Sequence, residues 1–91
     1  MELVQVLKEF VAEGQDWERK GTSVKGVSVI KLPSMTNRPA SLALDINPLN
    51  GQGLPIKKRG MMIMNAVEFA AFKETFSNLK LDNLIKAIEE V

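Results

Sequence analysis

The spacing of apolar residues changes twice along this chain of 91 residues, and that change limits the folds it can adopt. In residues 2–13 the apolar positions follow i, i+3, i+4 and i+7, which predicts an amphipathic helix ending before Gly14. These positions are Leu3, Val6, Leu7 and Phe10. From about residue 17 to 64 the pattern is that of strands, and from Asn65 it is helical again. The order predicts a single α+β domain over 1–91, with an N-terminal helix, a three- to four-stranded antiparallel sheet and a C-terminal long or broken helix.

Three segments of the middle region have the composition of strands. Residues 25–32 are rich in β-branched side chains, residues 40–46 alternate apolar and polar side chains, and residues 56–64 end in the apolar run Met61–Met64. That run is expected to be buried on both faces of the sheet, with the C-terminal helix covering one of them. Loops are predicted at 33–39 and 49–55, where Pro, Gly and small polar residues gather.

The C-terminal region begins with a helix start signal. Asn65 is a strong N-cap residue, and Glu68 follows three positions later as in a capping box. A first apolar stripe, interpreted as a core face, consists of Phe69, Phe72, Phe76 and Leu79. The phase then slips by two residues, so that either Asp82 caps a second helix or one helix continues and faces another surface. The second stripe predicts a homodimer or higher homo-oligomer, and its interface residues would be Leu81, Leu84, Ile88 and Val91.

The net charge of +1 conceals a basic middle between two acidic ends. Residues 1–18 carry a net charge of −4, residues 19–59 carry +7, and residues 60–91 carry −2. A concentrated positive surface attracts phosphates, because binding releases their condensed counterions. The alternative is that these side chains only solvate a sheet and discourage edge pairing.

Several kinds of chemistry are disfavoured by composition. The chain has no Cys, which excludes disulfides and thiolate catalysis, and no His, the commonest metal ligand. Asp45 is the only acid in residues 19–59, so no carboxylate pair is evident there. We therefore expect no enzyme activity, no metal and no cofactor. No segment has the pattern of a signal peptide or a membrane span, which favours a cytoplasmic location.

The candidate nucleic-acid-binding residues are the cations of the middle region and one aromatic residue. They are Trp17, Arg19, Lys20, Lys25, Lys31, Arg38, Lys57, Lys58 and Arg59. In a strand over 56–64, Lys57 and Arg59 would share one face about 7 Å apart, close to the spacing of phosphates in an extended single strand. Trp17 either stacks on a base or anchors a helix to the sheet, and Gly60 either admits a ligand or forms a bulge.

These residues support two hypotheses. The first is a non-catalytic protein that binds single-stranded DNA or RNA through an open basic sheet surface with little sequence preference. The second is an interaction or scaffold protein that assembles as a homo-oligomer, with its basic sheet against acidic helices of another chain. Both require the cations to gather on one side of the sheet.

A resemblance adds to the first hypothesis. The stretch Lys57–Asn65, followed by Phe69 and then Phe72-Lys73-Glu74, resembles the strand-to-helix element of the positive-cofactor-four-like ssDNA-binding fold. In the order of its elements the whole chain is similar to the ThermoDBP-related archaeal ssDNA-binding proteins. This resemblance implies that Lys57, Lys58 and Arg59 contact the DNA backbone and that the terminal helix assembles subunits.

Overall fold

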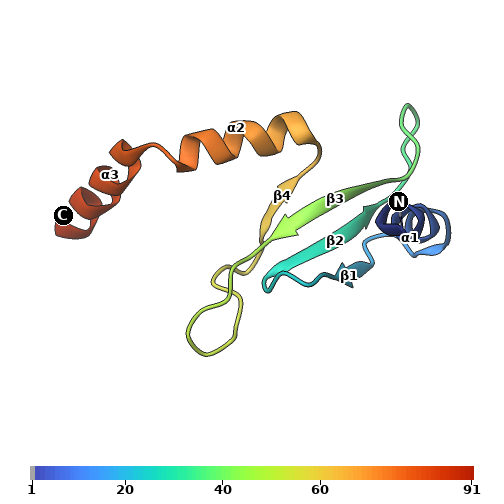
Figure 1. The fold of residues 1–91 in the computed structure, drawn as a ribbon, viewed down its shortest axis with the longest axis horizontal. Helices are drawn as coiled ribbons and strands as arrows, with labels where there is room; N and C mark the ends of the chain where they lie inside the picture. Colours follow the sequence, from blue (N-terminus) through green and yellow to red (C-terminus); the bar gives the residue numbers. More distant parts are fainter. Residues whose placement is uncertain (1) are drawn as a thin grey trace.

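The computed structural model describes residues 2–91, which form three helices and four strands (Figure 1). In chain order the elements are α1 (Glu2–Glu13), β1 (Arg19–Gly21), β2 (Val27–Leu32), β3 (Ser41–Ile46), β4 (Met61–Ile63), α2 (Ala66–Phe76) and α3 (Leu79–Glu90). The α+β class predicted from the sequence is confirmed, as is the extent of the first helix.

The four strands form one antiparallel meander in the order β1-β2-β3-β4. The β1–β2 turn spans residues 22–26, and Gly26 adopts a φ of 80° there, a conformation that suits glycine. The hydroxyl of Thr22 donates to the carbonyl of Val27 at 2.8 Å and accepts from the amide of Val24 at 3.1 Å, which stabilises the same turn. The β1–β2 turn and the long β3–β4 connection, residues 47–60, therefore lie at the same end of the sheet (Figure 1).

The strand register assigns each side chain to one of two faces, because cross-strand partners point to the same side. The helix face, toward α1 and α2, carries Lys20, Val29, Lys31, Leu42, Leu44, Ile46, Met61 and Ile63. The groove face carries Arg19, Ser28, Ile30, Ala43 and Asp45. A small buried cluster, Ile30, Leu32 and Ala43, forms the centre of the core.

Helix α1 is attached to the helix face through two basic side chains and one phenylalanine. The Nζ of Lys31 donates to the carbonyl of Gly14 at 2.6 Å, where the helix has just ended. A positive charge at this position also interacts favourably with the C-terminal end of the helix dipole. The Nζ of Lys20 lies 5.9 Å from the ring centroid of the buried Phe10. Both cations therefore hold the protein's own helix.

The last strand is shorter than the predicted strand over 56–64. Only Met61–Ile63 pairs with β3, and residues 56–59 form bends. Burial of this apolar run on both faces is also wrong, because Ile63 is buried while Met62 and Met64 are exposed. One physical reason is Pro48, which has no amide hydrogen to extend the ladder beyond Ile46.

Helix α2 begins at the predicted cap. The side chain of Asn65 accepts from the amide of Glu68 at 2.8 Å, and the Glu68 carboxylate accepts from the amide of Met64 at 3.3 Å. The helix ends at Phe76, and α3 starts with Asn78 as its cap, whose side chain accepts from the amide of Lys80 at 2.9 Å. The break therefore precedes Asp82, which lies in the first turn of α3 and does not cap it.

The two C-terminal helices leave the sheet as an arm (Figure 1). Within the described chain, neither helix contains a buried residue, and Phe76 is 62% exposed. The predicted core face of Phe69, Phe72, Phe76 and Leu79 is thus only partly covered by this chain, since α2 borders only the edge of the helix face. The Cα radius of gyration is 16.1 Å, whereas a compact domain of this length has a radius of about 12 Å.

Candidate nucleic-acid interface

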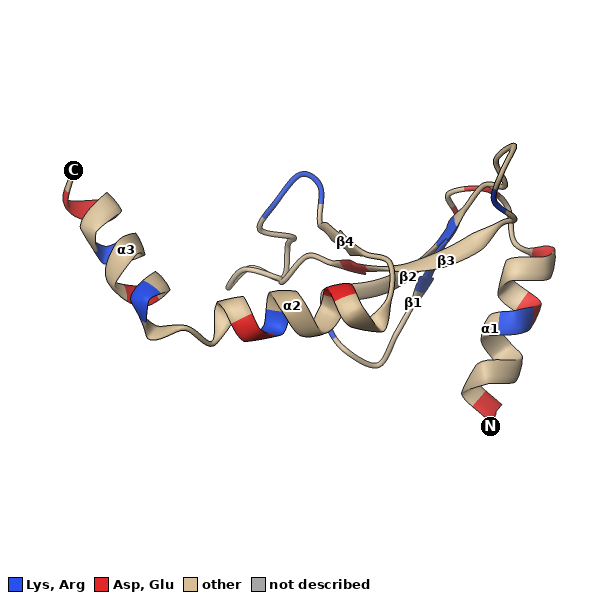
Figure 2. Cartoon of the chain, turned by 90° about the horizontal axis from the view of Figure 1, so that it is seen from above, with Lys and Arg blue, Asp and Glu red and all other residues tan. Residues whose placement is uncertain are grey.

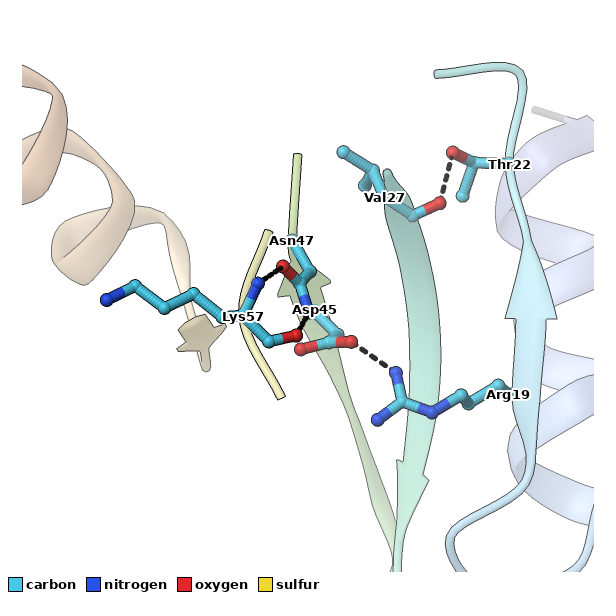
Figure 3. A network of polar contacts seen from close by, with 6 residues as sticks. All are labelled: Arg19, Thr22, Val27, Asp45, Asn47 and Lys57. Carbon is cyan, nitrogen blue, oxygen red and sulfur yellow. Dashed lines mark hydrogen bonds and ion pairs between the residues drawn. The ribbon is translucent and has the colours of Figure 1, made fainter. Parts of the chain in front are cut away.

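A groove of about 550 Å³ opens on the groove face, between the β1–β2 turn and the β3–β4 connection. We call it the basic groove because three cationic side chains line it: Arg19, Lys25 and Lys58. Lys57 also borders the groove, but its side chain points away from Arg19 (Figure 3) and lines a separate hollow near Phe76. The rest of its lining is mostly small or apolar and includes Val24, Val27, Leu49 and Pro55. None of its described lining residues belongs to a helix, so the acidic residues of the helices do not cover it.

Asp45 is the only carboxylate among the lining residues, and it is already paired. Its Oδ2 accepts from Nη1 of Arg19 across the intervening strand β2 (Figure 3). The Asp45 side chain is largely buried, whereas about half of the Arg19 side chain is exposed. A guanidinium has five N–H donors, so the exposed part of Arg19 can still donate to an anion. The three cationic side chains and one carboxylate give the groove lining a net charge of +2.

Different segments bring the cations to this groove. Arg19 lies on the edge strand β1 opposite Ile30, and Lys25 lies in the turn that ends at Gly26. Lys57 is held by Asn47, whose amide side chain makes two hydrogen bonds to the Lys57 backbone (Figure 3). Figure 2 shows the basic segment of this connection standing away from the helices.

The other four predicted cations do not line the basic groove. Lys20 and Lys31 point to the helix face and contact α1. Arg38 lies in the β2–β3 loop at the opposite end of the sheet, where its Nη2 lies 3.5 Å from the sulfur of Met35. Arg59 lines a separate hollow on the helix-face side, near Phe76. The expected gathering of all eight cations on a common sheet surface is therefore wrong, although the side chains of Arg19, Lys25 and Lys58 converge.

Trp17 lies outside the basic groove and has an unusual backbone conformation. Its φ is 67°, its side chain is 58% exposed, and its amide donates to the carbonyl of Lys31 at 2.7 Å. That bond places Trp17 at the end of β2 remote from the groove, about 15 Å along the strand from its start. The side chain is too exposed to serve as the expected anchor between a helix and the sheet.

Asn47 is the important residue that the sequence pattern did not reveal. It directly follows the strand predicted over 40–46, and its backbone amide donates to the carbonyl of Gly26 at 2.7 Å. Asn47 thus joins the turn that carries Lys25 to the segment that carries Lys57. Hydrogen bonds from a side chain to a backbone ten residues away produce no periodic pattern in the sequence. The only sequence feature that marks Asn47 is its position directly before a proline.

Comparisons of the chain with protein-family models, with curated proteins and with solved structures find no match. Within residues 2–91, no helix combines the length and the apolar character needed to cross a bilayer.

Proposed function

We propose that this protein binds single-stranded nucleic acid, in the first place ssDNA, without catalysing a reaction, and that the phosphate backbone lies in the basic groove. The observation that carries the proposal is the convergence of Arg19, Lys25 and Lys58 on one groove whose only carboxylate is already paired. Cations arranged in this way neutralise phosphates and release counterions, which gives affinity that falls with salt.

The lining of the groove favours a single strand over a duplex, because the bases of a single strand are free to contact apolar side chains. The groove lies between two loops and has a volume of about 550 Å³. The apolar side chains Val24 and Leu49 border the cations, and bases present apolar faces to such surfaces. Lysine side chains that contact phosphates read no base edges, so we expect little sequence preference.

The test compares two double variants of equal charge change. Lys25→Ala with Lys58→Ala removes two groove cations, whereas Lys8→Ala with Lys80→Ala removes two cations on α1 and α3. Affinity for oligo-dT is measured by fluorescence anisotropy across a range of salt concentrations. We expect the groove variant to bind more weakly, with a salt slope smaller by about 0.7 per lost phosphate contact. The control variant should keep the wild-type slope.

Equal losses in the two variants would contradict the proposal, because binding would then depend on net charge and not on the groove. Unchanged binding by the groove variant would also contradict it. Parallel titrations with duplex DNA, RNA and poly-glutamate identify the ligand class. Binding of poly-glutamate alone would favour an acidic protein partner.

We further propose that copies of this chain assemble through α2 and α3. The accessible surface of one chain is 7652 Å², whereas a folded monomer of this mass exposes about 5,300 Å². The excess of about 2,400 Å² per chain falls in the range that obligate homodimers bury per partner, about 1,000–2,500 Å². The arm contributes strongly exposed apolar side chains to this surface, among them Val67, Phe76 and Leu79.

Charge complementarity favours a second copy as the occupant of this surface. The segment 60–91, which contains the arm, has a net charge of −2, while residues 19–59 carry +7. The negative charge of the arm of one chain is therefore attracted to the positive charge of the sheet region of another. Light scattering after size-exclusion chromatography should give at least twice the chain mass of 10.1 kDa. A mass of one chain at high concentration would contradict this assembly.

A further inference from the structure

The helix face of the sheet carries three neighbouring hollows, which we together call the helix-face trough. The first, of about 310 Å³, lies between α1 and α2, and the other two have volumes of about 250 Å³ and 490 Å³. Ile63 and Phe69 line both the first and the second hollow, and Met61 and Phe76 line both the second and the third. The trough is therefore continuous along the sheet and α2.

The floor of the trough is an apolar surface that this chain covers incompletely. Along β3, the groove-face residues Ala43 and Asp45 are buried, whereas Leu42, Leu44 and Ile46 on the helix face are only half-buried. The side of the strand that α1 and α2 border is thus the more exposed one. Contiguous apolar surface of this kind is typical of a binding site for another protein segment.

Three cations, and no carboxylate, occur among the described residues that line the trough: Lys57 and Arg59 in the third hollow and Lys73 in the second. The Lys57 side chain points away from Arg19 and Asp45 (Figure 3). Within residues 2–91 the only ion pair joins Arg19 to Asp45, so the three trough cations have no carboxylate partner in that range. The trough therefore suits an occupant that is apolar on one face and acidic beside it.

Helix α3 has both of these properties. Leu84, Ile85 and Ile88 are exposed and share one side of the helix. Asp82 and Glu89 are seven positions apart, so they lie together on one flank of this apolar stripe. An apolar stripe with an acidic flank complements an apolar floor with cations beside it.

The junction between α2 and α3 carries α3 away from the trough of its own chain (Figures 1 and 2). The amide of Ser77 donates to the carbonyl of Lys73 at 3.2 Å, and the amide of Asn78 donates to the carbonyl of Thr75 at 3.1 Å. These bonds hold the junction in a conformation that extends the arm. Contact between the arms alone would leave the trough exposed, whereas an arm on the sheet of a second copy covers both surfaces.

We infer that α3 of one copy occupies the helix-face trough of a second copy, with its acidic flank beside Lys57 and Arg59, and that the exchange is reciprocal. This inference rests on the proposed assembly and names the surface that receives the arm. The apolar stripe over residues 81–88 is about 11 Å long, and the floor over residues 42–46 is about 13 Å long. A twofold dimer forms this contact twice.

The first experiment uses single cysteines, which report contacts without background because the chain has no Cys. One chain carries Met61→Cys on the trough floor, and a second, tagged chain carries Leu84→Cys on α3. The two are co-expressed and treated with a short bismaleimide, and we expect a cross-linked product that contains both chains. Val24→Cys in the basic groove replaces Met61→Cys in the control, which should lose this mixed product.

The second experiment compares two adjacent cations that line different surfaces. Arg59 lines the trough and Lys58 lines the basic groove, so Arg59→Glu and Lys58→Glu are matched charge reversals. Arg59→Glu should raise the dissociation constant of the assembly about tenfold in sedimentation, because the symmetric dimer loses the ion pair twice. Lys58→Glu should keep the wild-type dissociation constant and weaken the binding of oligo-dT instead.

The inference would be overturned if Leu84→Cys cross-links only to Leu84→Cys of another chain, or if Arg59→Glu weakens assembly no more than Lys58→Glu does. A dimer mass in light scattering would then leave the proposed assembly standing, with contact between the arms. A single-chain mass would refute the assembly and the inference together. Should Met61→Cys not fold, as judged by circular dichroism, Ile46→Cys takes its place, because Ile46 is the cross-strand partner of Met61 and the same mixed product is expected.

Discussion

The exposed apolar stripe of α3 makes a quantitative prediction about assembly. Leu84 and Ile88 lie one turn apart on α3 and are 58% and 64% exposed in a single chain. Full burial of such a side chain stabilises by about 1.5–3 kcal/mol, so covering the exposed part of each contributes about 1–2 kcal/mol. Two side chains from each of two subunits then contribute about 4–7 kcal/mol, or three to five powers of ten in the dissociation constant.

The perturbation is Leu84→Glu together with Ile88→Glu, measured by sedimentation over micromolar to millimolar concentrations. We expect the wild type to be dimeric or larger and the variant to be monomeric until far higher concentrations. Asn83→Glu is the matched control, because Asn83 projects from the opposite side of α3 and the substitution adds the same type of charge. The control should associate like the wild type.

The reasoning would be refuted by a variant that assembles with the wild-type dissociation constant. It would also be refuted if Asn83→Glu disrupts assembly as strongly, because added acidity and not the apolar stripe would then be the cause. Circular dichroism at low concentration distinguishes dissociation from loss of the helix, since an isolated helix of this length is marginally stable.

Two further predictions concern charges near the sheet. Asp45→Asn removes the only carboxylate of the basic groove, so oligo-dT should bind more tightly with a steeper salt slope, and weaker binding in the same titration would count against the proposed path of the phosphates. Lys31→Met removes the hydrogen bond to the Gly14 carbonyl. Hydrogen exchange at the C-terminal end of α1 should accelerate while oligo-dT binding stays unchanged, and a reduced salt slope would show instead that Lys31 reaches the ligand.

Local features of this fold are well predicted from the sequence because they depend on neighbouring residues. The helix over 2–13 follows from apolar spacing and Gly14, and the start of α2 follows from Asn65 and Glu68. The alternation in residues 40–46 likewise predicts β3 to within one residue. Each of these signals lies within one or two turns of helix or one strand.

The distribution of the cations over the two faces depends on contacts between residues distant in sequence, so local sequence patterns do not predict it. Alternation predicts that Lys31 and Val29 share one face of the sheet. It does not predict that α1 packs on this face and binds Lys31 through the carbonyl of Gly14. The strand predicted over 56–64 is shorter because Pro48 cannot donate to the ladder and the Lys57 backbone instead bonds to the Asn47 side chain. The apolar stripes of α2 and α3 are real, yet periodicity cannot tell whether the same chain or another one covers them, and Ile85, which completes the stripe of α3, is exposed as well.

The two proposals use opposite sides of the sheet. The basic groove opens on the groove face and includes no helical residue, whereas the arm leaves from the helix-face side, where Phe69 borders Ile63. If the arms of two chains pack on each other or in the helix-face troughs, each basic groove stays open and an assembly of two chains presents two such grooves. A strand long enough to reach both would bind with a higher effective concentration at the second groove than a short one. Weak, nonspecific phosphate contacts in the two chains would then combine.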